Sequence, residues 1–182
     1  MLTQEYLLEF KRLTEQRWKD LVMEPGVYGL QLRPGTRWND GISETEISTY
    51  ESAVGTKFPH ALRAFLRVMN GTDLPAINVY GRSGEPNRTS AGVYSFPRDA
   101  HMIEQRIEDV RRCRNEIEVD LREQGYDLSP KARLVPFYSH RYVVCTKDLD
   151  QSTVLSIYVP SVDAVVYGKS LREYLEREFL GI

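Results

Sequence analysis

The stretch from Trp38 to Leu74 constrains the fold most, because it contains start and stop signals for two short amphipathic helices. Ser43 and Glu46 have the spacing of a capping box, in which the hydroxyl accepts a helix amide and the carboxylate accepts the amide of the cap residue. Gly55 suits the left-handed backbone that commonly ends a helix. The first of the two helices is therefore predicted between Ser43 and Gly55.

The second helix is predicted to follow at once, between Pro59 and the pair Asn70-Gly71. Proline is tolerated in a first helical turn, where the backbone needs no intrahelical donor. The apolar residues that follow recur at helical spacing and form one stripe, made of Leu62, Phe65, Leu66 and Met69. Asn70-Gly71 is interpreted as the C-cap of this helix.

Two further helices are predicted outside this stretch, one over residues 3–23 and a longer one over about 99–124. The longer helix has a narrow apolar stripe and a broad charged face, which is typical of a helix lying on a protein surface. Residues 81–92 are rich in glycine and polar residues and are predicted as a loop.

The last third of the chain contains most of the strand signals. Four strands are predicted, over Leu134 to Phe137, Arg141 to Cys145, Thr153 to Val159 and Val162 to Tyr167, before a final helix that begins at Ser170. Shorter strands are predicted within Val27 to Leu32 and Ala76 to Tyr80. Helices come first and strands cluster late, so we expect an α+β fold with a largely antiparallel (mixed) sheet flanked by helices.

The ordered series of signals in residues 36–80 resembles the SUKH superfamily, which includes fungal cell-wall regulators of the Smi/Knr type. Residues about 132–180 resemble the family more loosely. The motifs that carry the resemblance are Trp38, Gly41-Ile42-Ser43, Glu46-Ile47, Glu51, Gly55, Phe58-Pro59, Phe65-Leu66 and Asn70-Gly71. The resemblance implies one SUKH-like domain over residues 1–182, a length that leaves room for a real core.

Composition argues against several classes of protein. The net charge of −2 supplies no basic field that would attract nucleic acid, and no apolar run approaches the ~20 residues of a membrane helix. The N-terminal residues lack the pattern of a secretion signal, and Cys113 and Cys145 fit free thiols in a reducing compartment. We therefore expect a cytoplasmic protein without direct contacts to nucleic acid or membrane.

The sequence also lacks the common motifs of catalysis and cofactor binding. It contains no Gly-rich phosphate loop, and His60, His101 and His140 lie too far apart to form a local metal pair. We therefore predict no enzyme activity, no cofactor and no metal site. Residues that converge only in space stay open as an alternative.

Candidate partner-binding residues are aromatic or charged side chains near predicted strands. Tyrosine and arginine are enriched at binding hot spots, and the candidates are Trp38, Tyr138, His140, Arg141, Tyr158 and Asp163. Each has a plain structural alternative. Trp38 could cover the first turn of the helix that follows Ser43, and residues 138–142 could be a plain strand entry with Tyr142 in the core, His140 bonded to the backbone and Arg141 in solvent.

The resemblance implies a bacterial immunity protein, which neutralises a cognate toxin domain by binding it. Two alternatives stay open at this point: a regulatory or scaffold protein that docks on a cellular partner, and a small-ligand binder or enzyme that uses a groove in the sheet. We expect a monomer or a weak homodimer.

Overall fold

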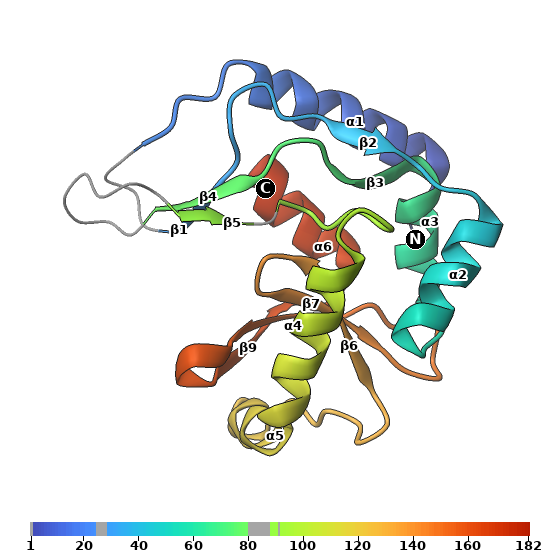
Figure 1. Ribbon diagram of the computed structural model, residues 1–182, viewed down its shortest axis with the longest axis vertical. Coiled ribbons are helices and arrows are strands. Elements are labelled where there is room, and N and C mark those ends of the chain that lie inside the picture. The colour runs from blue at the N-terminus through green and yellow to red at the C-terminus, as the bar shows by residue number, and fades with distance from the viewer. Residues whose placement is uncertain (1, 25–28, 80–87, 91) are drawn as a thin grey trace.

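The computed structural model of the chain describes residues 2–24, 29–79, 88–90 and 92–182, and it shows an α+β fold (Figure 1). The predicted fold class is confirmed. The helices are α1 (Gln4–Lys19), α2 (Glu44–Val54), α3 (His60–Val68), α4 (Ala100–Arg112), α5 (Arg114–Glu123) and α6 (Leu171–Leu175), which continues as the wider turn η2 (Glu176–Leu180). The strands are β1 (Gly29–Gln31), β2 (Trp38–Asp40), β3 (Met69–Thr72), β4 (Ala76–Val79), β5 (Arg88–Ser90), β6 (Arg133–Tyr138), β7 (Arg141–Cys145), β8 (Val154–Tyr158) and β9 (Asp163–Gly168), with the short turn η1 (Val159–Ser161) between the last two.

The described strands form three antiparallel sheets. Their orders are β1-β4-β5, β2-β3 and β6-β7-β8-β9. The largest sheet contains the four strands predicted near the C-terminus, and each of them pairs with its neighbour in the sequence. Antiparallel neighbours need only short connections, which explains why this sheet could be predicted from periodicity and turns.

Helix α2 forms as its capping signals predict. The Ser43 hydroxyl accepts the Glu46 amide at 3.3 Å, and the Glu46 carboxylate accepts the Ser43 amide at 2.8 Å. Gly55 ends the helix with φ at 70°, in the left-handed region. Local hydrogen bonds therefore fix both ends of α2.

A buried carboxylate joins α2 to α3. The side chain of Glu51 is only 2% exposed, and it accepts the amide of Phe58 at 2.9 Å, the ammonium of Lys57 at 2.8 Å and the guanidinium of Arg63 at 2.5 Å. A buried charge is tolerated only when such partners satisfy it. Glu51 thus holds the turn between the two helices and the first turns of α3 in one arrangement.

Trp38 lies at the centre of an aromatic cluster. Its ring centroid is 5.1 Å from that of Trp18 and 5.5 Å from those of Phe65 and Phe179, and its indole N–H donates to the Thr14 hydroxyl at 2.8 Å. Tilted and edge-to-face rings at these distances add roughly 0.5–1.5 kcal/mol per pair beyond burial itself. The cluster ties α1, α3 and the C-terminal segment together.

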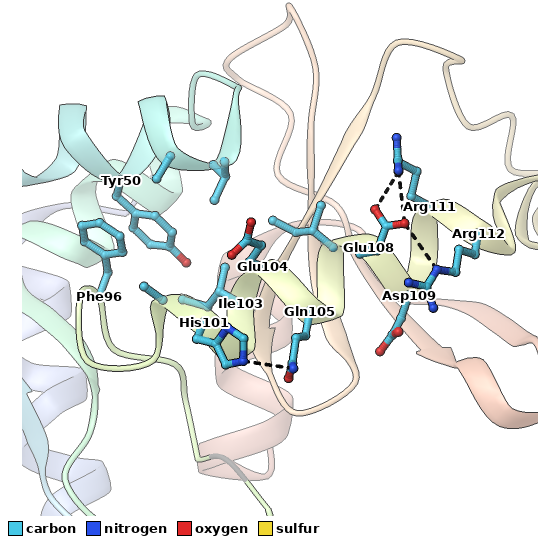
Figure 2. A pocket seen from close by; sticks show the side chains of 14 residues that line it. Tyr50, Phe96, His101, Ile103, Glu104, Gln105, Glu108, Asp109, Arg111 and Arg112 are labelled. Atoms are coloured by element: carbon cyan, nitrogen blue, oxygen red, sulfur yellow. Dashed lines mark hydrogen bonds and ion pairs between the residues drawn. The ribbon is translucent and has the colours of Figure 1, made fainter.

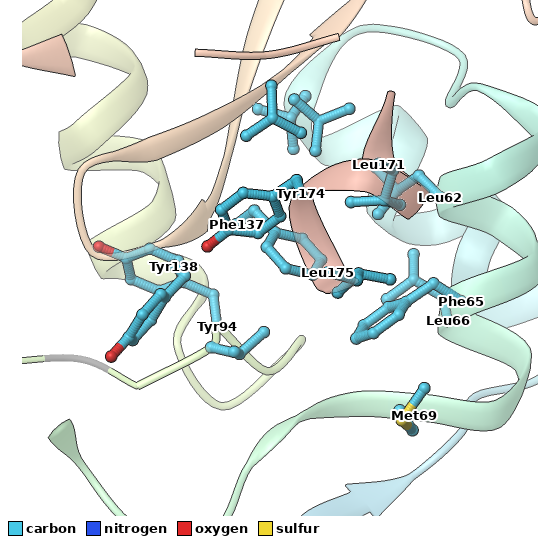
Figure 3. Close-up of a cluster of buried hydrophobic side chains, with 14 of the residues drawn as sticks. Leu62, Phe65, Leu66, Met69, Tyr94, Phe137, Tyr138, Leu171, Tyr174 and Leu175 are labelled. Atoms are coloured by element: carbon cyan, nitrogen blue, oxygen red, sulfur yellow. The ribbon is translucent and has the colours of Figure 1, made fainter. Parts of the chain in front are cut away.

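The four-stranded sheet separates two groups of buried side chains. On one face α4 and α5 pack against a group that includes Val110, Ile117, Leu121, Tyr142, Leu155, Ile157 and Ala164. On the other face Phe137, Val143 and Val154 belong to the main core. Figure 3 shows Phe65 of α3 and Leu175 of α6 pointing into this main core.

The predicted long helix over 99–124 is wrong in its continuity. Cys113 has φ −106° and ψ 26°, so the chain breaks there into α4 and α5. The two helices pack on different strands: α4 packs mainly on β6, and α5 packs mainly on β9. Charge pattern and apolar period did not signal the break, because both helices present the same kind of surface.

Three other boundaries also differ from the predictions. The first helix ends at Lys19, and residues 88–90 of the predicted loop form β5. Residues 25–28, 80–87 and 91 lie outside the described part.

Asn70-Gly71 belongs to β3 and does not cap α3. Asn70 accepts the Phe96 amide and donates to its carbonyl, while a Cβ on Gly71 would approach the carbonyl of Tyr94 to 2.6 Å. Long-range packing therefore overrides the local capping signal.

Glu51→Gln is expected to lower the free energy of unfolding by about 2–3 kcal/mol at neutral pH, because hydrogen bonds to a buried charge are among the stronger ones. Burial alone would raise the pKa of Glu51, but bonds from Lys57, the Phe58 amide and Arg63 outweigh it and hold the pKa below its ordinary 4.5. The contribution should therefore be present above pH 4.5 and disappear as pH falls through the lowered pKa.

Denaturant unfolding at a series of pH values measures this difference. Glu44→Gln is the matched control, since Glu44 also pairs with Arg63 but is exposed, and it should cost much less. An equal loss in both variants, or a Glu51 effect that persists in acid, would contradict the role given to this carboxylate.

Candidate protein-binding site

The structure separates the six candidate residues into two sets. Trp38 and Tyr138 are 4% and 2% exposed and lie in the core. His140, Arg141, Tyr158 and Asp163 lie together at one end of strands β7, β8 and β9. Only the second set is therefore available as a surface in this conformation.

Strand register places Arg141, Tyr158 and Asp163 of this second set on one face of the sheet. Arg141 lies opposite Ser156, and Tyr158 lies opposite Asp163. Side chains alternate between the faces of a sheet, and the intervening residues are buried beneath α4 and α5. The same alternation adds Val165 and Tyr167 to this face.

Helices α3 and α6 cover this face near Val143 and Val154, and Tyr174 of α6 contacts the half-buried ring of Tyr167. At its other end Tyr158 remains 43% exposed and Val165 36% exposed. We call the part of this face that is exposed or half-exposed the open sheet half; it is made of Arg141, Ser156, Tyr158, Asp163, Val165 and Tyr167. In Figure 1 this end of the sheet, marked by orange β9, lies on the opposite side of the molecule from α2 and α3.

Two guanidinium groups stack on the ring of Tyr167. The Cζ atom of Arg141 lies 4.0 Å from the ring centroid, and that of Arg177, from η2, lies 4.2 Å from it. Arginine on an aromatic face gains electrostatic attraction while keeping its donors free. The sequence analysis missed Tyr167 and Arg177, the two residues that stack with Arg141 in this group. Alternation from Asp163 could have indicated Tyr167, but nothing local indicates that Arg177 reaches the same ring.

His140 occupies the β6–β7 turn beside this stack. Its ring lies 6.2 Å from that of Tyr158, edge to face. Burial, with the positive charges of Arg141 and Arg106, lowers the pKa of His140 to about 4. The imidazole is therefore neutral at pH 7.

A separate groove of about 980 Å³ lies between α2 and α4, with Tyr50, Phe96 and Ile103 among the residues that line it (Figure 2). Tyr50 and Phe96 stack with their centroids 4.4 Å apart. Along the rim Glu108 pairs with Arg111 and Arg112. None of the residues that line the groove belongs to the open sheet half, so the two features are distinct surfaces.

Within the described residues, no three His, Cys, Asp or Glu side chains are grouped so that they could hold a metal ion. Both cysteines are free, as predicted, and burial raises the pKa of the Cys145 thiol. Among the described helices, none combines the length and apolar character that crossing a membrane requires.

Comparison with known families now gives this geometry a context. The family model described as SMI1 / KNR4 family (SUKH-1) matches residues 41–177, well over half of the chain. The chain belongs to the SUKH-1 family. The resemblance drawn from residues 36–80 is thereby confirmed. No curated protein matches the sequence significantly.

Members of SUKH-1 in general bind partner proteins. The match begins at Gly41 and ends at Arg177, so it includes α2, α3, the four-stranded sheet and the first residues of η2. It therefore contains the whole open sheet half and the second arginine of the stack.

His140 should titrate near pH 4 in the folded SUKH-1 chain and near its ordinary 6.5 when unfolded. Between these values the unfolded chain binds a proton that the folded chain does not, so stability should fall as pH drops from 6.5 toward 4. His140→Gln should remove this part of the pH dependence. NMR titration of the imidazole measures the pKa directly.

Arg106→Gln provides the control, because removal of this nearby cation should raise the pKa of His140 part of the way toward 6.5. A folded-state value of 6.5 in the unmodified protein would contradict the burial and charge environment described here.

Proposed function

We propose that this chain is a non-catalytic protein-binding module that neutralises a cognate toxin domain by direct, stoichiometric contact. The observation that supports it best is the open sheet half, where tyrosine and arginine side chains stand on paired strands. Residues of these types dominate binding energy at interfaces, and strands hold them with little entropy left to lose on binding.

The size of the surface fits one part of an interface. The six residues of the open sheet half are fewer than the roughly 20–30 residues that each partner contributes to a standard interface. Neighbouring elements must therefore take part. We propose that η1 and η2 complete the contact around Tyr158 and Arg177.

The environment of His140 favours binding over catalysis. A general base works best with a pKa near the working pH and with a group that orients it. His140 has a pKa of about 4 and lies beside Arg141 and Arg106, which oppose its protonation. This arrangement suits a fixed neutral contact residue better than a proton acceptor.

A regulatory or scaffold role remains the alternative, since it would use the same kind of surface. The two roles differ in their partner, because immunity requires a toxin, typically encoded next to the gene for this chain. We further propose that the chain acts in the cytoplasm as a monomer, where it would meet a toxin before the toxin damages the cell.

Co-expression with the product of the adjacent gene is expected to restore growth that this product alone prevents, and the two chains should co-purify in a 1:1 complex. Tyr158→Ala should weaken the complex about tenfold or more if this tyrosine is a central contact, as measured by calorimetry. Val119→Ala, an exposed apolar position on α5, serves as the matched control. A harmless neighbour and no co-purifying protein would sink the immunity proposal.

A further inference from the structure

We propose that the protein partner binds the open sheet half through an acidic segment, with one of its carboxylates seated on the Arg141–Tyr167–Arg177 stack. This inference rests on the proposed protein-binding function and adds the chemistry of the partner. It follows from donors that the fold positions and leaves unused.

Arg141 is positioned but incompletely paired. Its Nη1 donates to the Ser156 hydroxyl at 2.7 Å, and its Nε is buried without a hydrogen-bond partner. A buried unpaired donor is costly and rare enough to need an explanation. The Nη2 of Arg141 also has no hydrogen-bond partner in the described part of the chain and, unlike Nε, is not buried. Arginine binds a carboxylate through two parallel hydrogen bonds from the edge formed by Nε and Nη2, so a carboxylate that approaches at Nη2 would complete this site once a small shift of the side chain opens Nε.

Arg177 adds a second positive charge, because its guanidinium also stacks on the ring of Tyr167. Its side chain is exposed, and within the described residues neither Arg177 nor Arg141 has a carboxylate within 4.0 Å. Several other arginines of this chain are paired with carboxylates, as Arg63 is with Glu51 and Arg114 with Glu118. Two like charges are thus held close together without a counter-ion.

Among the described residues, no nearby carboxylate neutralises the positive charges of Arg141 and Arg177. Burial raises the pKa of Tyr174, and the nearby Glu178 carboxylate adds to this effect, but in the part of the chain that the structure describes Glu178 forms no ion pair with either arginine of the stack. His140 is neutral at pH 7, and the nearby Arg106 of α4 is paired with Asp109, so the unpaired charge is that of Arg141 and Arg177. A local positive patch therefore exists on a chain whose net charge is −2, and complementary charge favours an acidic partner segment.

The same surroundings favour a protein carboxylate over a nucleic acid. A phosphate backbone spreads its charge along its length and requires a continuous basic track. Here the exposed carboxylate of Asp163 lies on the same sheet face as the stack. A single carboxylate can reach the stack without meeting Asp163, whereas a strand of phosphates would be repelled.

A Glu–Gly repeat peptide tests this chemistry without any knowledge of the toxin. In NMR titrations of the full chain it should shift the Nε–H signal of Arg141, and the Gln–Gly counterpart should not. Arg177→Glu should reduce its affinity by about tenfold or more, and Arg141→Lys should weaken it several-fold because lysine keeps the charge but loses the two-bond edge. Arg122→Glu, an equal charge change on α5 at the opposite face of the sheet, should leave it unchanged.

Equal binding of both peptides, an equal loss in Arg122→Glu, or tighter binding of single-stranded DNA would overturn the inference. The experiments separate a failure of this inference from a failure of the proposed immunity function. If no toxin is found but the acidic peptide binds the stack, the inference stands and the immunity role falls. If a toxin binds with the same affinity to Arg177→Glu and Arg141→Lys, the immunity role stands and the inference falls.

Discussion

Packing of the C-terminal segment against the four-stranded sheet is the interaction on which the surface of this protein depends. Tyr174 and Phe179 lie in the main core, where Phe179 contacts Trp18 and Trp38 and Tyr174 contacts Phe137. These contacts hold α6 and η2 over one end of the sheet and leave the other end uncovered. The core thus determines both how much of the sheet is buried and how much is offered to a partner.

The open sheet half combines rigidity with unused polar capacity. Strand pairing fixes the backbone of Arg141. The ring of Tyr167, on β9 two strands away in the same sheet, orients the guanidinium of Arg141 and also that of Arg177 from η2. Little side-chain entropy remains to be lost, so contacts made there contribute more of their energy to affinity. Variation in a few residues on this face would change the partner while the aromatic core and the Glu51 network keep the fold, which suits a family whose members bind proteins.

Prediction from the sequence succeeded where the signals are local. The Ser43–Glu46 capping box, Gly55 and the four late strands form as expected, because each depends on residues a few positions apart. Prediction failed where contacts between residues far apart in the sequence determine the local structure. Asn70-Gly71 has the composition of a helix cap but pairs with the segment around Phe96, and Cys113 interrupts a continuous charged pattern because α4 and α5 follow different strands.

The candidate site shows the same division. Alternation from Arg141 could place several residues on one sheet face, and four of the six candidates do lie together. Trp38 and Tyr138 are buried instead, because large aromatic side chains near the core gain most by removal from water. Arg177 could not be found, since its place in the stack depends on the path of the whole C-terminal segment.

Hydroxyl-radical footprinting of the complex with the co-purified partner tests the central claim most directly, because it reports which side chains the partner covers. The account predicts that Tyr158 and Tyr167 become protected on binding, while Met102, which is exposed on α4, is oxidised as fast as in the free chain. Protection of Met102 with unchanged oxidation of Tyr158 and Tyr167 would contradict it.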